Sequence, residues 1–212
     1  MVVAVKKSQI AYMATPKAAC SSVKIALLQL MQGGGVPDLQ DLHQMLPTMR
    51  FRQHRFRLYR DYWWFCVVRD PIRRLMSVYT DIVVGRKLLL TSPNLTTKDL
   101  GLAVSPDPDA FFQELGRYAR HASVIKHHCL PAHVFTGPDL SVYDRVYTTA
   151  ELPQLGADLR QISHKTANVP NANKSAGTLN FEDLNAVTQA RLIPYLKREY
   201  AYLSAYYDDP FT

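Results

Sequence analysis

The sequence predicts an α/β fold in which helices flank a central parallel sheet in three layers. The stretches 10–14 and 63–68 are short apolar runs, and the second is solidly apolar, as expected of a strand that is buried on both faces of a parallel sheet. Each run leads into a segment whose apolar residues have helical spacing. Strands that alternate with helices along the chain are typical of this fold class.

The first helix is predicted to begin near Ser21 or Ser22 and to end before the glycines at 33–35. Its apolar face is supplied by Val23, Ala26, Leu27, Leu30 and Met31. A strand, a tight turn and a helix therefore follow one another. The backbone N–H groups at such a helix start, together with the positive end of the helix dipole, bind phosphate.

Polar residues around this turn suit an anion. Lys17 precedes the helix and can add a positive charge, while Ser21 and Ser22 can donate hydroxyl hydrogen bonds. The Walker pattern GxxxxGK[ST] is absent, because no glycine lies between Thr15 and Lys24. Taken alone, the stretch fits an ordinary strand–turn–helix corner with a solvated lysine equally well.

A second strand end carries a more specific pattern. Asp70 is a good N-cap, and Pro71 suits the first helical position. Arg69 would stand at the carboxyl end of the strand, where open α/β sheets bind their ligands. Ser77 follows two turns into the helix. The buried face of this helix is predicted to consist of Ile72, Leu75, Met76, Tyr79 and Val83.

Together the two stretches resemble the nucleotide motifs of sulfotransferases that use 3′-phosphoadenosine 5′-phosphosulfate (PAPS). The 5′-phosphosulfate loop is matched by Pro16, Lys17, Cys20, Ser21, Ser22 and Lys24. The 3′-phosphate motif, (F/V)xRDPxxRLxSxY, is matched by residues 65–71 with Arg74, Leu75, Ser77 and Tyr79. The chain is most similar to the carbohydrate sulfotransferases related to the HNK-1 and chondroitin/dermatan enzymes (sulfotransferase family 2) and to their short bacterial relatives. This resemblance implies a P-loop-like fold.

The resemblance also implies roles for individual residues. Lys17 would neutralise charge at the bridging and sulfuryl oxygens, and no metal would be required. Arg74 would belong either to the 3′-phosphate site or to an ion pair with Asp70. Lys174 lies in a late N-x-S element and is otherwise a solvated loop lysine. The residues expected to bind PAPS are Pro16, Lys17, Ala18, Ala19, Cys20, Ser21, Ser22, Lys24, Arg69, Arg74, Ser77 and Lys174.

A base must take the proton of the acceptor alcohol, and histidines are the candidates. His43 lies between the two motifs, as a candidate base does in short bacterial relatives, with His54 as the fallback; either is otherwise a surface histidine. His128 with Pro131 resembles the family's H-x-x-P-Q stretch, although Ala132 replaces the glutamine. Zinc is not favoured for the histidines at 121–133, since no thiol or carboxylate stands at ligand spacing.

Composition bounds the remaining expectations. A chain of 212 residues with 47% apolar content predicts one domain, residues 1–212. The net charge of +7 suits a protein that holds a polyanionic nucleotide. The arginines at 50–60 are interpreted as a solvated helix face rather than a nucleic-acid site. Three distant cysteines, no membrane-spanning run and no signal peptide favour a cytoplasmic, bacterial-like enzyme over a truncated Golgi one.

The later segments predict the remaining elements. Turn formers dominate 85–108, which indicates a long loop with short helices. A helix is expected from Asp109, a strand at 142–147 and a helix at 151–162. Asn180 is expected to cap a helix that Pro194 breaks or after which a new one starts.

Three other functions remain open from the sequence. A P-loop-like small-molecule kinase would need magnesium and ATP, yet a Walker lysine and a recognisable Walker aspartate are lacking. A non-catalytic member of the family would bind nucleotide or glycan without transferring a group. A basic RNA-binding module would use residues 50–60. The acceptor is expected to be an alcohol, with carbohydrate favoured by family analogy.

Overall fold

The structure, a computed structural model, describes residues 2–32, 38–170 and 177–212. It divides into two compact units. Unit 1 consists of Met1–Arg69 and Pro131–Lys174, and unit 2 consists of Asp70–Leu130 and Ser175–Thr212. The boundary after Arg69 separates the strand of the second motif from the helix that follows it. The expectation of a single domain stays a prediction.

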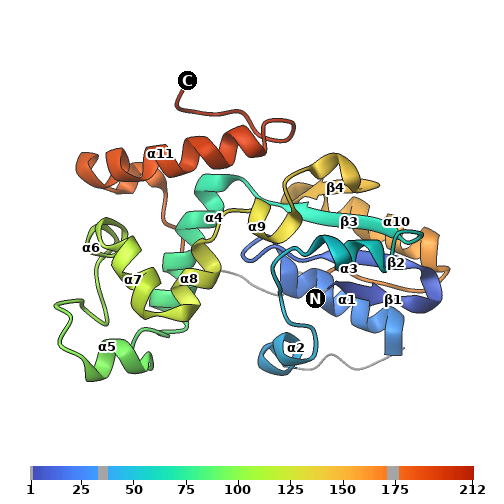
Figure 1. Cartoon of the computed structure of the whole chain (residues 1–212), viewed down its shortest axis with the longest axis horizontal. Coiled ribbons are helices and arrows are strands. Elements are labelled where there is room, and N and C mark those ends of the chain that lie inside the picture. The colour runs from blue at the N-terminus through green and yellow to red at the C-terminus, as the bar shows by residue number, and fades with distance from the viewer. Residues whose placement is uncertain (1, 33–37, 171–176) are drawn as a thin grey trace. The chain divides into compact units, whose positions relative to one another are not determined.

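Unit 1 is built on a mixed sheet whose strands follow the order β1-β2-β3-β4 among the described residues (Figure 1). The strands are β1 (Val3–Val5), β2 (Ile10–Met13), β3 (Trp63–Val68) and β4 (Arg145–Thr148). β2, β3 and β4 are parallel, whereas β1 pairs antiparallel with β2. Because Met13 of β2 pairs with Cys66 of β3, the two strands end at the same edge of the sheet.

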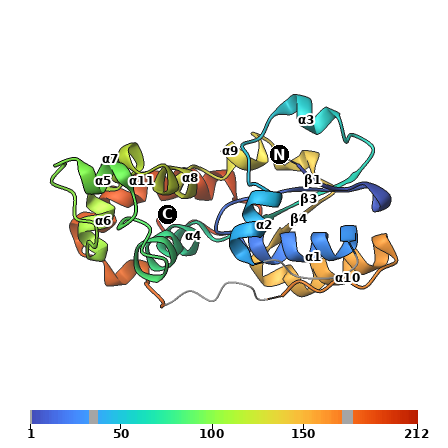
Figure 2. The ribbon, with the colours of Figure 1, turned by 90° about the horizontal axis from the view of Figure 1, so that it is seen from below.

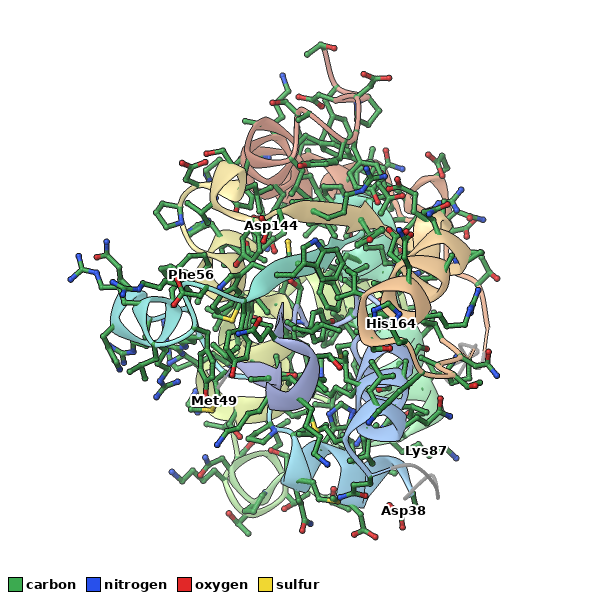
Figure 3. The ribbon with its side chains drawn as sticks, turned by 90° about the vertical axis from the view of Figure 1, so that its right-hand side faces the viewer. Asp38, Met49, Phe56, Lys87, Asp144 and His164 are labelled. Carbon is green, nitrogen blue, oxygen red and sulfur yellow. The ribbon has the colours of Figure 1, made fainter. Side chains whose placement is uncertain are left out.

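Helices cover both faces of this sheet. α1 (Cys20–Gln32) and α10 (Leu152–Ser163) lie on one face, and α3 (Gln53–Arg57) lies on the other (Figure 2). Figure 3 shows the same layers end-on, with Phe56 of α3 on one side of the sheet and His164, after α10, on the other. The α/β three-layer fold class is therefore confirmed, with the antiparallel β1 as an addition to the parallel sheet.

Apolar side chains explain why the layers hold together. Alternate strand residues point to opposite faces, so each face of the sheet packs against its own helices. On one face the core contains Tyr12, Phe65, Val67, Tyr147, Val23, Leu27, Leu155 and Leu159. On the other face the ring of Phe56 stacks on Trp64 with a centroid distance of 4.0 Å. The remaining elements of unit 1 are η1 (Lys6–Ser8), α2 (Leu39–Met45), α9 (His133–Thr136), η3 (Leu140–Val142) and η4 (Thr149–Glu151).

Unit 2 is helical in the residues that the structure describes. Its elements are α4 (Pro71–Val78), the π-helical η2 (Tyr79–Gly85), α5 (Pro93–Thr97), α6 (Pro108–Gln113), α7 (Leu115–His121), α8 (Ser123–Cys129), η5 (Phe181–Asp183) and α11 (Ala186–Tyr202). α4 begins as predicted, because the Asp70 side chain accepts a hydrogen bond from Arg73 N at 2.8 Å. The core of this unit includes Leu75, Met76, Phe111, Phe112, Ile125, Leu192, Leu196 and Tyr200.

The expectation that Pro194 breaks the last helix is wrong. α11 continues through Pro194 to Tyr202. A proline inside a helix costs about 3 kcal/mol. Leu192 and Leu196 are buried on either side of the exposed Pro194, so packing of the apolar face keeps both segments in one helix.

Two further findings concern the predicted end of α1 and the question of membrane-spanning helices. The glycines 33–35, which were expected to end α1, lie outside the described residues. Among the residues that are described, no helix has both the length and the apolar character needed to cross a membrane.

Candidate functional site

The turn between β2 and α1 has an unusual backbone. Lys17 and Ala19 have positive φ angles of 65° and 55°, which residues other than glycine rarely adopt. Left-handed residues placed between right-handed ones turn successive N–H groups toward one side and form an anion-binding concavity. The first intrahelical hydrogen bond of α1 runs from Val23 N to Ala19 O at 3.1 Å, so the N–H groups before Val23 mark the positive end of the helix.

Thr15 opens this turn with a fully buried hydroxyl. Within the described part of the chain its Oγ1 has no hydrogen-bond partner. An unsatisfied buried hydroxyl costs about 1–3 kcal/mol, and a ligand oxygen that pairs with it would remove this cost. Together with the positive charge of Lys17, this orphan hydroxyl fits an anionic group such as a phosphate.

Arg69 joins the ends of the two parallel strands. It follows β3 directly, and its Nη1 donates a hydrogen bond to the carbonyl oxygen of Lys17 at 3.1 Å. Both residues belong to unit 1. The contact brings a guanidinium beside the turn, where it adds positive charge and helps to hold the left-handed backbone of Lys17.

The start of α1 also contacts α2. Ser21 Oγ lies 3.1 Å from His43 Nε2, and Lys24 Nζ lies 3.2 Å from His43 Nδ1. Lys24 also donates to Thr48 Oγ1 at 2.7 Å. Lys24 is fully buried, and burial lowers the pKa of its ammonium. The structure therefore brings three sequence-predicted site residues, Ser21, Lys24 and His43, into one cluster.

The other residues of the turn differ in exposure. Pro16, Ala18 and Ser22 are buried, whereas Lys17 and Cys20 are partly exposed. Ala19 is partly exposed as well. Lys174, the last of the expected binding residues, lies outside the described residues.

Arg74 lies in unit 2 and has a partner that differs from the expected one. Its Nη2 donates to Glu199 Oε2 at 2.9 Å, to Tyr195 OH at 2.9 Å and to Leu130 O at 3.0 Å. The alternative ion pair with Asp70 is wrong, because the Asp70 carboxylate caps α4 and accepts from Tyr200 OH at 2.7 Å.

Burial alone would lower the pKa of the Arg74 guanidinium, but Tyr195 and Glu199 raise it overall. Its Nε and Nη1 are buried without a hydrogen-bond partner in the described part of the chain. Ser77 Oγ donates to Arg74 O at 2.7 Å within the same helix. A nucleotide contact by Arg74 or Ser77 stays a prediction.

His128, one of the candidate bases, makes a hydrogen bond that fixes which ring nitrogen is basic. His128 Nδ1 lies 2.8 Å from the carbonyl oxygen of Val124 in α8. A carbonyl only accepts, so Nδ1 carries the hydrogen and Nε2 is the basic atom of the neutral ring. Among the described histidines, cysteines and carboxylates, no three are placed to hold a metal ion.

Sequence reasoning missed several contacts of these residues. Thr15 was not singled out for its orphan hydroxyl, and Thr48, Tyr195 and Glu199 were not considered. The full burial of Lys24 could not be predicted from the sequence, because its position in the helical pattern lies near both buried and exposed residues. The Arg74–Glu199 pair joins residues 125 positions apart, which no local pattern predicts.

An anion-type turn after one strand and an arginine after its parallel neighbour are features that suit a phosphate ligand. The family model described as "Sulfotransferase family" matches residues 1–206, and the chain belongs to this family. The reaction class of the family is sulfuryl transfer to an acceptor. Comparisons with curated proteins and with solved structures gave no match.

Proposed function

We propose that the protein transfers the sulfuryl group of PAPS to a hydroxyl of an acceptor, and that the acceptor is a carbohydrate. The observation that carries the donor assignment is the contact of Arg69 Nη1 with Lys17 O at 3.1 Å beside the orphan hydroxyl of Thr15. It gathers a guanidinium, a lysine and an unsatisfied donor at one helix start. Carbohydrate as the acceptor rests on the resemblance of the two motifs to that branch of the family.

The roles of the residues follow from their chemistry. PAPS supplies an activated sulfuryl group when it is bound. The N–H groups of Cys20, Ser21 and Ser22 and the hydroxyls of the two serines hold the 5′-phosphate, and Arg69 binds the 3′-phosphate by charged hydrogen bonds. Lys17 stabilises the negative charge that develops during transfer, which is the main demand of such reactions.

The acceptor's proton needs a base. His128 is the proposed base, since its hydrogen bond to Val124 O leaves the lone pair of the neutral ring on Nε2. Its Nδ1–H also fixes the orientation of the ring. A cytoplasmic location belongs to the proposal as well, because Cys20, Cys66 and Cys129 are all free thiols.

Ligand titrations followed by the melting temperature test the donor assignment. The product 3′-phosphoadenosine 5′-phosphate should raise the melting temperature, whereas ATP with magnesium and RNA should not. Stabilisation by ATP with magnesium alone would favour a kinase, and stabilisation by RNA alone would favour the basic stretch 50–60 as the functional surface. Binding of the bisphosphate without transfer of labelled sulfate to any acceptor in a carbohydrate panel would identify a non-catalytic member.

A lysine substitution tests the chemistry. Lys17→Ala should remove more than about 2 kcal/mol of transition-state stabilisation, the scale of one lost preorganised donor. Lys7→Ala is the matched control, because Lys7 is an exposed lysine of the same unit. Equal kcat/KM for the two variants would refute the role of Lys17.

A further inference from the structure

The segment that leads from α2 to β3 carries most of the net positive charge of the chain. Residues 42–60, which we call the arginine segment, contain five arginines, no lysine and no acid. The whole chain has 25 lysines and arginines against 18 acids, so most of its net charge of +7 comes from this segment. The five residues are Arg50, Arg52, Arg55, Arg57 and Arg60, and Arg55 alone among them is half-buried rather than exposed.

The charge of this segment differs from that of an ordinary solvated surface. Solvated surfaces mix charges of both signs, so that acids lie beside the cations. Here Arg60 pairs with the exposed Asp61 at 3.6 Å. The other four arginines make no ion pair within the described residues, and the sequence has no acid outside them. Four guanidinium groups are therefore available to an external anion.

The aromatic residues of the arginine segment hold it against the rest of unit 1. The ring of Phe56 stacks on Trp64 of β3, and Trp64 Nε1 donates to Tyr59 O at 2.8 Å. Phe51 N donates to Val134 O at 2.9 Å. All three aromatic residues of the segment are half-buried. Because these rings pack against the protein, they do not offer the stacking platform that single-stranded RNA needs.

Exposed aliphatic side chains accompany the arginines. Seven large apolar side chains are exposed among the described residues, and three of them belong to the arginine segment. They are Leu58, which is 73% exposed, Met45 and Met49. Met49 lies on the same side of unit 1 as Phe56 of α3 (Figure 3). A soluble polyanion offers such side chains no apolar partner, whereas the acyl chains of a lipid membrane do.

We propose that the arginine segment docks the protein on an anionic lipid membrane. The guanidinium groups bind the phosphates of the head groups, and the three exposed aliphatic side chains enter the boundary with the acyl chains. A guanidinium binds a phosphate by two parallel hydrogen bonds. Each arginine near an anionic membrane strengthens binding about fivefold. The proposal goes beyond the proposed function, because it needs no ligand at the start of α1.

Flotation of the full chain with lipid vesicles tests the docking. One set of vesicles contains phosphatidylcholine with about 30% phosphatidylglycerol, and the other contains phosphatidylcholine alone. We expect binding to the anionic vesicles alone, and we expect it to weaken as salt rises from about 0.05 M to about 0.5 M, because salt screens the attraction. Absence of binding to the anionic vesicles at the lower salt concentration would overturn the proposal.

A pair of arginine substitutions tests which cations bind the head groups. Arg52→Gln/Arg57→Gln should weaken binding to the anionic vesicles about 25-fold, which is about fivefold for each arginine. Arg160→Gln/Lys165→Gln is the matched control, because it removes two exposed cations in and just after α10, which lies on the opposite face of the sheet. The control should bind within about twofold of the unaltered protein. Equal losses in the two variants would show that the net charge alone attracts the vesicles, against the proposal.

A leucine substitution tests the contact with the acyl chains. Leu58→Gln should weaken vesicle binding about tenfold, because the apolar side chain no longer leaves water on docking. Leu90→Gln is the matched control, since Leu90 is an exposed leucine of unit 2. If Leu58→Gln binds as well as the control, the segment recognises charge alone and membrane docking is wrong. Melting temperatures of all variants report whether they fold.

A labelled single-stranded RNA oligonucleotide separates membrane docking from nucleic-acid binding. We expect RNA to bind more weakly than the anionic vesicles at the same salt concentration. RNA binding that Arg52→Gln/Arg57→Gln abolishes, in a protein that does not float with anionic vesicles, would identify a nucleic-acid surface instead. None of these measurements uses the bisphosphate, so docking and the proposed function succeed or fail independently.

Discussion

Each unit of the molecule buries a cation, and the two are compensated differently. Lys24 in unit 1 is 0% exposed and Arg74 in unit 2 is 3% exposed. Arg74 faces the carboxylate of Glu199 at 2.9 Å, and Glu199 is itself 2% exposed. The described contacts of Lys24 are the imidazole of His43 and the hydroxyl of Thr48, with no carboxylate among them.

We interpret this difference as one between a structural charge and a ligand-binding charge. A buried charge without a counter-charge costs several kcal/mol, so a fold supports it where something else repays the cost. Burial lowers the pKa of Lys24, whereas the surroundings of Arg74 raise the pKa of its guanidinium overall. We interpret Arg74 as a clamp between α4 and α11, and Lys24 as a charge whose compensation is completed by the ligand phosphate.

Removal of the carboxylate in unit 2 should have the largest effect on stability. Glu199→Gln leaves the Arg74 charge buried and unpaired, which should lower the free energy of unfolding by about 3–5 kcal/mol. Urea denaturation measures this loss. Glu182→Gln, at an exposed glutamate of the same unit, should change it by less than about 0.5 kcal/mol. Equal values for the two variants would contradict the clamp.

The next largest loss of stability is expected at Asp70, because its carboxylate accepts hydrogen bonds from two partners. Asp70→Ala removes the N-cap of α4 and leaves Tyr200 OH without this acceptor, and the two losses should sum to about 2 kcal/mol. Tyr200→Phe in the same background should restore part of the loss, since the hydroxyl that lost its acceptor is then absent. Strictly additive losses in the double variant would show that the hydroxyl is satisfied elsewhere.

Lys24→Met should have an effect opposite to that expected of Glu199→Gln, with little loss of stability but weaker ligand binding. The variant removes a desolvated charge, and it deprives only half-buried groups, His43 and Thr48, of a partner. The free energy of unfolding should therefore change by less than about 1 kcal/mol, while the bisphosphate binds about tenfold more weakly. Calorimetric titration measures the affinity, with Lys7→Met as the exposed control. A large loss of stability with unchanged affinity would make Lys24 a structural charge like Arg74.

Lys24 and the buried tyrosines should respond to pH with opposite signs. Burial lowers the pKa of Lys24, so between that lowered value and about pH 10.4 the unfolded chain binds more protons than the folded one. The contribution of Lys24 to stability therefore rises with pH in this window, and the stability of the unaltered protein relative to Lys24→Met should rise with it.

Buried tyrosines act in the other direction at the alkaline end. Burial raises the pKa of Tyr195 and of Tyr200 above the usual value, so their contribution falls as the pH rises beyond about 10. Urea denaturation between about pH 7 and pH 10.5 measures both trends. A difference between the unaltered protein and Lys24→Met that stays flat with pH would contradict the lowered pKa of Lys24.

Local rules predicted much of the fold. The solid apolar run defined β3 with its observed bounds, and Asp70 and Pro71 marked the start of α4, because burial patterns and caps are read within a few residues. The antiparallel β1 was missed, since a strand of three residues is too short for a pattern. Pro194 was misjudged because packing of α11 outweighs a local penalty.

The candidate site was predictable only in part. The motifs named Lys17, Ser21, Lys24 and Arg69 as ligand residues, but nothing in them indicates that His43 joins Ser21 across 22 positions of sequence. Contacts of this kind depend on how α1 and α2 pack. The roles of these residues stay predictions that the experiments above address.

The position of the tryptophans offers a way to watch the units separately. The chain has two tryptophans, Trp63 and Trp64, and both belong to β3 in unit 1. Their fluorescence, which for Trp64 depends on the stacked ring of Phe56, reports the melting of the sheet, whereas circular dichroism follows helices throughout the chain. Coincident unfolding curves from the two probes would mean one cooperative transition. A fluorescence change that occurs after the loss of helical circular dichroism would mean that the helical unit unfolds first.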